Sequence, residues 1–370
     1  MSDDTLRMLR DSAADFAKLD PVRVRRFRNA HPGFDRSVWQ QMADMGWLGV
    51  LIPEAHQGMG LGIGAAVIIA EQLGRALYPE PYCASAMLAT LSLLHGDSEE
   101  LKQRYLPQLN AGKLVAGLAW QGEGGGLDVA QCGVLAREHD GKFVLEGKSR
   151  FVEIPDADAF IVSARTAHGL ELHWIARDAA GLACTPEPRA DGSASALLSF
   201  DRVIASAATR VASASCALPA LKLAVDYAVV GASAELLGIM DSALALTLDY
   251  LRTRVQFGKA IGSFQALQHR AVDLYIQKEL SRAALESASA TLADPSCTTE
   301  QRAAAASSVK ARASQAALAI CNEALQMHGA IGFTDEYDLG LYLNRALVVS
   351  AWLGNASAHR RRYSSILEAA

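Results

Sequence analysis

The chain has 370 residues, of which 51% are apolar and 20% charged, a balance typical of folded globular proteins rather than disordered ones. Its 35 basic against 40 acidic residues give a net charge of −5, so we expect no nucleic-acid partner. No run of about 18 uninterrupted apolar residues occurs, so we also expect no membrane span.

The first module is predicted to be helical and to cover residues 1–112. Apolar positions recur three and four residues apart in SVWQQMADMGWLGVLI and AAVIIAEQLGRAL, which is the period of a half-buried helix. The pair Asp97 and Glu100 resembles a capping box before LKQRYLPQL. A glycine-rich loop, PEAHQGMGLGIG, separates two of the expected helices.

A small antiparallel β domain is predicted for residues 113–215. Short segments such as KFVLEG, AFIVSAR and ALLSFDRVI are rich in β-branched and aromatic residues, and turn signals separate them. Helical periodicity returns over residues 216–370, where long alanine-rich segments favour a closely packed helix bundle. The predicted fold is therefore mostly α: an N-terminal helical domain, a central β domain and a C-terminal helix bundle.

Cysteine and histidine spacing predicts neither disulfides nor a metal site. The six cysteines are scattered, with no CxxC pair and no histidine at metal-ligand spacing. The N-terminal segment MSDDTLRMLRDSAADF is charged and is not typical of a signal peptide. We therefore expect a reduced, soluble, cytoplasmic protein without a bound metal.

The segment from Arg254 to Gln265 is the first with a chemical signature. On a structural interpretation, Arg254 complements a helix C-terminus and Gly258 supplies a left-handed cap. On a functional interpretation, the Arg254 guanidinium binds a pyrophosphate, Phe257 offers a flat apolar face, and Gln256 and Gln265 offer hydrogen-bonding groups. Both interpretations are compatible with the residues alone.

A second segment, QMHGAIGF, begins at Gln326. Glycines such as Gly329 at a helix end let a phosphate-bearing ligand approach backbone N–H groups closely, although a simple helix stop is the other interpretation. His328 by itself is typical of a hydrogen-bonded core histidine rather than a catalytic one.

Together the two segments resemble the acyl-CoA dehydrogenase family, and the resemblance spans nearly the whole chain. It is carried by SVWQQMADMGWLGVLIPEAHQGMGLG, EELKQRYLPQLNAGK, AELLGIMDSALALTLDYLRTRVQFGKAIGSFQALQH and QMHGAIGFTDEYDLGLYLNRA. In that family, RxQFG and QxxGG bind the ADP part of FAD for a neighbouring subunit. The resemblance thus implies six FAD contacts: Arg254, Gln256, Phe257, Gln265, Gln326 and Gly329. Ala330 stands where a second glycine is common.

The residues that correspond to the family's catalytic base are not acidic. That reaction removes a proton alpha to a thioester carbonyl, which requires a carboxylate in reach, while flavin accepts a hydride. Family members place the base in one of two positions, and by register these correspond to Leu353 and Ala228. Asp226 faces away from Ala228 on the same expected helix, and Glu235 lies about 10 Å along it. Neither is a convincing replacement.

The segment expected to contact flavin also differs from the family pattern. Residues Gly122–Asp128 carry added glycines, and Leu127 lies where a serine often contacts the thioester. Glu153 falls in the later flavin-contacting stretch, where a negative charge is unfavourable for a flavin that accepts hydride. The flavin and substrate half is therefore altered, whereas the ADP-binding half is retained.

This combination resembles the non-catalytic subunit of heterotetrameric acyl-CoA dehydrogenases that act on steroid side chains or pimeloyl-CoA. The resemblance implies a related catalytic subunit as partner, an acyl-CoA substrate, and electron transfer to an electron-transfer flavoprotein. Two alternatives remain open. One is a self-sufficient homo-oligomeric dehydrogenase with a displaced base, Glu235 or Glu153 being the residues to test first. The other is a flavin-free assembly scaffold.

Overall fold

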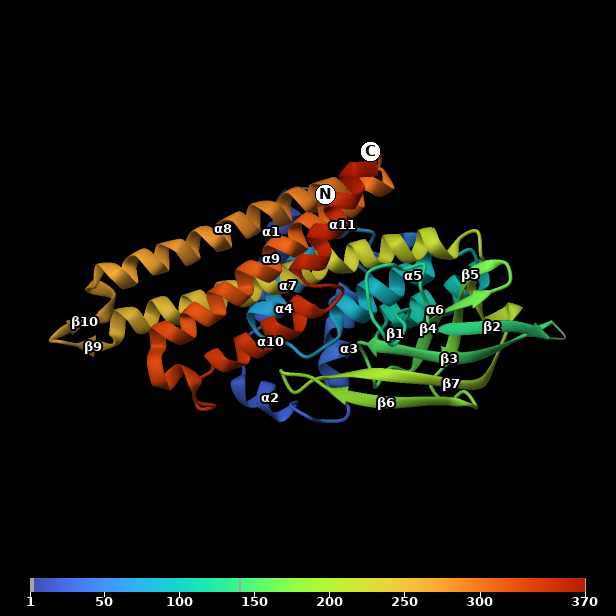
Figure 1. Cartoon of the computed structure of the whole chain (residues 1–370), viewed down its shortest axis with the longest axis horizontal. Coiled ribbons are helices and arrows are strands. Elements are labelled where there is room, and N and C mark those ends of the chain that lie inside the picture. Colours follow the sequence, from blue (N-terminus) through green and yellow to red (C-terminus); the bar gives the residue numbers. More distant parts are fainter. Residues whose placement is uncertain (1–2, 140, 370) are drawn as a thin grey trace. The chain divides into compact units, whose positions relative to one another are not determined.

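The computed structural model describes residues 3–139 and 141–369, which form two compact units. Each unit collects segments from distant parts of the sequence. The helical unit contains residues up to 26, 67–78 and from 229 onward, and the β-containing unit contains 27–66 and 79–228. Two helices, α4 (Ile63–Arg75) and α7 (Ala217–Thr253), run from one unit into the other. Figure 1 shows the elements in chain order.

The helical unit is built around α7 and the helices that follow it in the sequence, which are α8 (Gln265–Ala293), α9 (Thr299–His328), α10 (Leu339–Ala351) and α11 (Ala356–Ala369). It also contains α1 (Asp3–Phe16), α2 (Pro21–Arg26), β9 (Val255–Gln256), β10 (Lys259–Ala260) and 3-10 turns at Ile261–Ser263 and Gly329–Phe333.

Small residues let the helices of this unit approach closely. A Cβ added at Gly74 of α4 would lie 2.3 Å from the Glu235 carbonyl oxygen, and one at Gly238 of α7 would lie 2.0 Å from the Glu71 carbonyl oxygen. No side chain fits in that space, so the two backbones are in direct contact at these glycines. At the start of α9, the Thr298 hydroxyl accepts from the Gln301 backbone N–H and the Gln301 side chain accepts in return, which fixes that end.

Ion pairs hold α8 against α4 and α7. Arg282 of α8 contacts Glu71 at 3.1 Å and Asp241 at 2.9 Å, and both carboxylates are nearly buried. Lys278 and Arg75 also contact Asp241, at 3.1 and 3.0 Å. Both carboxylates, Glu71 and Asp241, are therefore paired, so neither leaves an unpaired charge buried in the bundle. Their ion pairs support the packing of the three helices.

The β-containing unit combines a sheet with short helices. The helical elements are α3 (Arg36–Asp44), 3-10 turns at Trp47–Gly49, Glu54–His56 and Ala207–Thr209, a π-helix at Tyr82–Ala89, α5 (Thr90–Leu94) and α6 (Glu99–Asn110). The strands are β1 (Ala116–Ala119), β2 (Val134–His139), β3 (Lys142–Val152), β4 (Ala159–Thr166), β5 (Gly169–Ala176), β6 (Leu182–Pro188), β7 (Ala194–Ser206) and β8 (Arg210–Ala212).

The sheet runs in the order β6-β7-β3-β2-β4-β5-β8, with β1 added on β4. Most neighbours are antiparallel, as expected, but β1 and β2 both run parallel to β4, so the sheet is mixed. A period-two pattern indicates which face of a strand is buried and does not specify the direction of its neighbour. Trp174 of β5 stacks on Tyr105 of α6, with ring centroids 4.0 Å apart, and this contact packs α6 against the sheet.

The predicted fold class is confirmed, and one predicted cap is wrong. Helices precede and follow a central β region. However, Ser98 rather than Asp97 is the N-cap of α6, and its hydroxyl accepts from the Leu101 backbone N–H at 3.4 Å. Asp97 accepts instead from the Ser213 backbone N–H at 3.1 Å. Asp and Ser are both favoured at an N-cap, so the residue types alone do not decide between them. The end of β8 (Arg210–Ala212) brings Ser213, which donates to Asp97.

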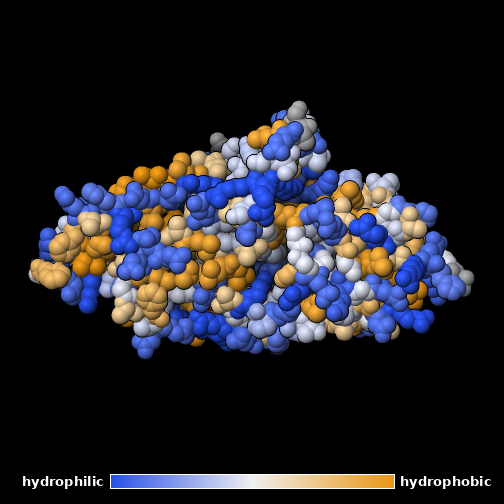
Figure 2. Space-filling model, in the orientation of Figure 1, coloured by the Kyte–Doolittle hydropathy of each residue, from blue (hydrophilic) through white to orange (hydrophobic). Residues whose placement is uncertain are grey.

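Helix α7 is long and apolar enough to span a membrane by composition, but 78% of its most apolar window is buried inside the protein. Such burial is typical of a core helix. Figure 2 shows that hydrophilic and apolar residues are interspersed on the visible surface, with apolar residues gathered over part of α8.

Candidate functional site

The Arg254 segment forms a hairpin at the end of α7. The Arg254 backbone N–H donates to Tyr250, and β9 then pairs with β10, with Gln256 opposite Lys259. Phe257 and Gly258 form the turn, with φ of 53° and 79°. The predicted helix cap at Gly258 is therefore wrong: positive φ at two successive residues is the requirement of a tight hairpin turn.

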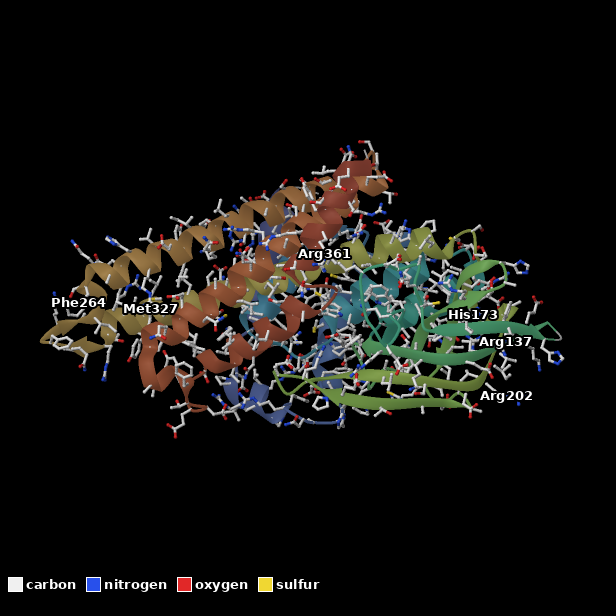
Figure 3. The ribbon with its side chains drawn as sticks, in the orientation of Figure 1. Arg137, His173, Arg202, Phe264, Met327 and Arg361 are labelled. Carbon is white, nitrogen blue, oxygen red and sulfur yellow. The ribbon has the colours of Figure 1, made fainter. Side chains whose placement is uncertain are left out.

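Phe257 is presented to solvent by this turn. Its side chain is 90% exposed, and its ring meets Phe264 edge-on with centroids 6.2 Å apart. The Lys259 ammonium lies 4.3 Å from the Phe264 ring centroid, a cation–π contact that braces the hairpin. Figure 3 shows Phe264 beside the β9–β10 hairpin and Met327 on α9. The exposed ring is accessible to a ligand or another chain, and its predicted contact with a cofactor stays a prediction.

The second predicted segment contacts the last turns of α7, from which this hairpin extends. Helix α9 ends at His328, and Gly329 follows with φ of 66° and open space where a Cβ would point. The Tyr250 hydroxyl donates to the His328 carbonyl at 3.2 Å, and the two rings stack with centroids 4.3 Å apart. Because Tyr250 is one turn before Arg254, this contact joins the two segments.

His328 supports the site without acting as a base. The ring is buried, and its Nδ1 lies 2.7 Å from the Ala324 carbonyl oxygen. With Nδ1 as donor, Nε2 accepts from the Tyr337 hydroxyl at 3.1 Å. Burial lowers the pKa of His328, against an opposing effect of the Ala324 carbonyl. The neutral ring therefore fixes the turn after α9, and the expectation of a hydrogen-bonded core histidine is confirmed.

The six predicted cofactor residues share one property, which is that all are exposed: Arg254, Gln256, Phe257, Gln265, Gln326 and Gly329. The ADP part of FAD suits the groups that these residues offer, which are a guanidinium, amides, a flat aromatic ring and an accessible glycine at a helix end. Their exposure fits a ligand that a second chain helps to enclose. The residues that the chain presents therefore fit the cofactor, although these roles remain predictions.

Leu353 lies between α10 and α11 in a left-handed conformation, with φ of 55°. Its side chain is buried, at 2% exposure, and its carbonyl accepts from His359 Nε2 at 2.8 Å. Burial lowers the pKa of His359 to about 3, and nearby Lys310 acts in the same direction. The first expected base position is therefore held rigidly and is filled by hydrocarbon.

Lys310 of α9 lies beneath the same turn and was not predicted as a functional residue. It is fully buried, and its ammonium donates to the carbonyls of Val349 at 2.8 Å and Ser350 at 3.1 Å, and to the Ser314 hydroxyl at 3.1 Å. It thus caps the C-terminal end of α10, where partial negative charge accumulates. A lone lysine among alanines at helical spacing is the sequence signal that indicates such a buried cap.

Ala228, the second expected base position, is also fully buried in α7. Asp226 is buried on the same helix, and its carboxylate belongs to the interior of the protein. The expectation of a structural role for Asp226 is compatible with this burial.

Glu235 and Glu153, the two replacement bases to test, are both engaged in ion pairs. Glu235 Oε1 lies 2.6 Å from Arg345 Nε, and Glu153 Oε1 lies 2.5 Å from an Arg189 Nη1. Each of the two carboxylates is therefore held by a guanidinium within its own chain. Arg189 also offsets the charge of Glu153, so the predicted unfavourable effect of Glu153 on a flavin is smaller than its sequence position suggests.

Phe151, next to these charges, is a second aromatic residue with positive φ, 61°. It sits where the register of β3 against β7 shifts, and Arg150 lies over its ring at 5.1 Å. Arg150 also pairs with Glu187 at 2.8 Å. Two ion pairs therefore flank this register shift and fix the conformation of Phe151. They are Arg150 with Glu187, and Glu153 with Arg189.

Comparisons with known proteins agree with these features. The models of the acyl-CoA dehydrogenase N-terminal and C-terminal domains match residues 3–113 and 205–366. Acyl-CoA dehydrogenase IpdE2 of Mycobacterium tuberculosis is 30% identical over 92% of this chain and 90% of its own.

Two solved structures have the same fold along the whole chain. A variant of the Tcur3481–Tcur3483 steroid ACAD has a TM-score of 0.89 at 29% identity, covering 99% of this chain and 98% of its own. The ChsE4–ChsE5 complex of Mycobacterium tuberculosis has a TM-score of 0.90 at 26% identity, covering 100% and 99%. The chain belongs to the acyl-CoA dehydrogenase family.

Proposed function

We propose that this chain is the non-catalytic, FAD-sharing subunit of an α2β2 acyl-CoA dehydrogenase, in which a related chain supplies the base. The main support for this proposal is that apolar residues, Leu353 and Ala228, occupy both positions at which the family places its base. Leu353 is 2% exposed and Ala228 is fully buried. Neither hydrocarbon accepts a proton, and the reaction requires a carboxylate near the carbon alpha to the thioester.

The cofactor-binding side chains support the sharing of FAD. Flavin, when bound, accepts the hydride in this family's reaction. The exposed Arg254, Phe257 and Gln326 suit the pyrophosphate and adenosine of that cofactor. Because they project outward rather than into an enclosed cavity, they fit a cofactor held partly by another chain.

The relatives offer a model for the partner. The ChsE4–ChsE5 structure is a complex of two differently named chains, and the steroid ACAD structure likewise names two. By analogy, we propose that this chain pairs with a related acyl-CoA dehydrogenase subunit, and that the pair oxidises an acyl-CoA and passes electrons to an electron-transfer flavoprotein. Its six free cysteines fit a cytoplasmic protein.

Purification of the tagged chain from its own cells tests the assembly. We expect a second, related chain with an acidic residue at one of the two base positions, together with bound flavin. The chain purified alone should not bleach flavin when an acyl-CoA is added. Substantial bleaching by the chain alone would show that it is catalytically self-sufficient, and a flavin-free complex would show that it serves assembly only.

Arg254→Ala tests the cofactor assignment. Loss of one charge-assisted contact, worth about 1.5–3 kcal/mol, should weaken flavin retention by the complex about 10- to 100-fold. Arg252→Ala removes another exposed arginine, from the last turn of α7, and serves as the matched control. Equal flavin occupancy in the two variants would refute the role of Arg254.

A further inference from the structure

Three aromatic side chains, Tyr250, His328 and Tyr337, join the end of α7 to the end of α9. The Tyr250 and His328 rings stack with centroids 4.3 Å apart. The Tyr337 ring lies 5.0 Å from His328 and meets Tyr250 edge-on at 6.4 Å. Each pair is therefore within the distance at which aromatic rings attract one another. Figure 1 shows that α7 and α9 end on the same side of the helical unit.

Hydrogen bonds run through the same cluster. The Tyr250 hydroxyl donates to the His328 carbonyl oxygen at 3.2 Å. The Ala324 carbonyl oxygen, 2.7 Å from His328 Nδ1, only accepts, so Nδ1 carries the proton of the neutral ring. His328 Nε2 then accepts from the Tyr337 hydroxyl at 3.1 Å. The cluster thus links the last turns of α7, the end of α9 and the segment that leads into α10.

The connection between α9 and α10, residues 329–338, is held at both of its ends. Near its start, a Cβ added at Gly332 would lie 3.0 Å from the His328 Cβ, so the connection packs directly on that residue. At its end, Asp338 accepts from Arg25 of α2 at 2.7 Å, and both side chains are largely covered. Phe333, in the middle of the connection, is 73% exposed. The ends of this segment are therefore fixed while its middle faces outward.

The cluster lies between the two predicted cofactor segments. The Arg254 backbone N–H donates to the Tyr250 carbonyl oxygen at 2.9 Å, so Arg254 begins one helical turn after Tyr250. Gln326 and Gly329 flank His328 on the other side. Groups from two segments bind one dinucleotide well only if their spacing is set before the ligand arrives, because otherwise binding must also order them.

We propose that Tyr250 is a positioning residue of the cofactor site. Through His328 and Tyr337 it fixes the Arg254 hairpin relative to the turn after α9, so that both segments contact one dinucleotide. The inference rests on the proposed role of these segments in binding FAD. Tyr250 is half-buried and acts without touching the cofactor.

Flavin retention by the complex purified from its own cells tests this role. Tyr250→Phe keeps the ring and removes the hydroxyl, and loss of that hydrogen bond should weaken flavin retention about 3- to 10-fold. Tyr250→Leu also removes the stacked ring and should weaken retention further, about 10- to 100-fold. Tyr363→Phe removes the hydroxyl of a tyrosine of α11 that is 37% exposed, and this matched control should retain flavin like wild type.

A double-mutant cycle separates positioning from a general loss of stability. If Tyr250 acts through the Arg254 hairpin, its hydroxyl has less to position once the guanidinium is removed. Tyr250→Phe combined with Arg254→Ala should then weaken retention by less than the product of the two single effects. A combined effect equal to that product would show that Tyr250 acts independently and would overturn the inference.

The outcomes separate this inference from the proposed function. Unchanged flavin occupancy in Arg254→Ala would refute the cofactor assignment and the inference with it. Loss of flavin from Arg254→Ala, with full retention in Tyr250→Phe and Tyr250→Leu, would overturn the inference alone. Far-ultraviolet circular dichroism reports whether each variant is folded. Should Tyr250→Leu fail to fold, Tyr250→Phe, which preserves the packing of the ring, decides the result.

Discussion

Replacement of Lys310 by methionine gives the sharpest test of how the turn before Leu353 is held. Lys310 is fully buried and donates to the Val349 and Ser350 carbonyls at the end of α10. Burial lowers its pKa to about 7, and the Glu235 carboxylate only partly opposes this effect. His359 also lies near Lys310, and Arg362 acts in turn on His359.

The lowered pKa makes stability depend on pH with a definite sign. In the unfolded chain Lys310 has its ordinary pKa of 10.5, so between about pH 7 and 10.5 the unfolded state binds more protons than the folded state. The Lys310 contribution to the free energy of unfolding therefore rises with pH over this window, by up to about 1.4 kcal/mol per pH unit. The whole difference corresponds to an upper bound of about 5 kcal/mol.

Chemical denaturation of wild type and Lys310→Met at several pH values from 7 to 10 measures this effect. Other titrating groups are common to both proteins and cancel in the difference. We expect the wild type to gain stability relative to Lys310→Met as pH rises. Lys222→Met, which removes an exposed lysine of α7, controls for the loss of a positive charge. Parallel pH profiles for wild type and Lys310→Met would refute the argument that burial of an ammonium shapes this turn.

Two further predictions concern packing and the His328 turn. Gly238→Ala places a Cβ 2.0 Å from the Glu71 carbonyl oxygen and should lower the free energy of unfolding by about 3 kcal/mol in denaturant titrations. Gly340→Ala, where a Cβ meets nothing within 4 Å, should not, and equal effects would contradict the direct contact of α4 with α7. Because burial lowers the pKa of His328, the unfolded chain takes up this proton first, and stability should fall as pH drops below the ordinary value of 6.5. His328→Gln should reduce this loss of stability below pH 6.5, whereas His269→Gln, at an exposed position of α8, should not. An unchanged loss of stability in His328→Gln would count against a buried neutral ring.

Local signals in the sequence were sufficient for the fold class, whereas the cofactor segments rest on a family resemblance and stay a prediction. Alanine-rich helical periodicity predicts the bundle, and alternating β-branched residues predict strands, because burial of one face imposes a period on the sequence. The same reasoning failed at Gly258 and Asp97. A glycine or an acid near a helix end suits either a cap or a turn. Which of the two forms depends on the residues that folding brings close to it.

The tertiary structure alone decided the roles of the charged side chains. In sequence, Glu235 and Glu153 are two isolated carboxylates, and Lys310 is one lysine among alanines. Folding brings Arg345, more than one hundred residues distant, to Glu235, and Arg189 to Glu153. Charge partners are selected by distance in space, which a local pattern does not contain. The absence of an acid at Leu353 is readable from the sequence, whereas the engagement of the acids that remain is a property of the folded chain.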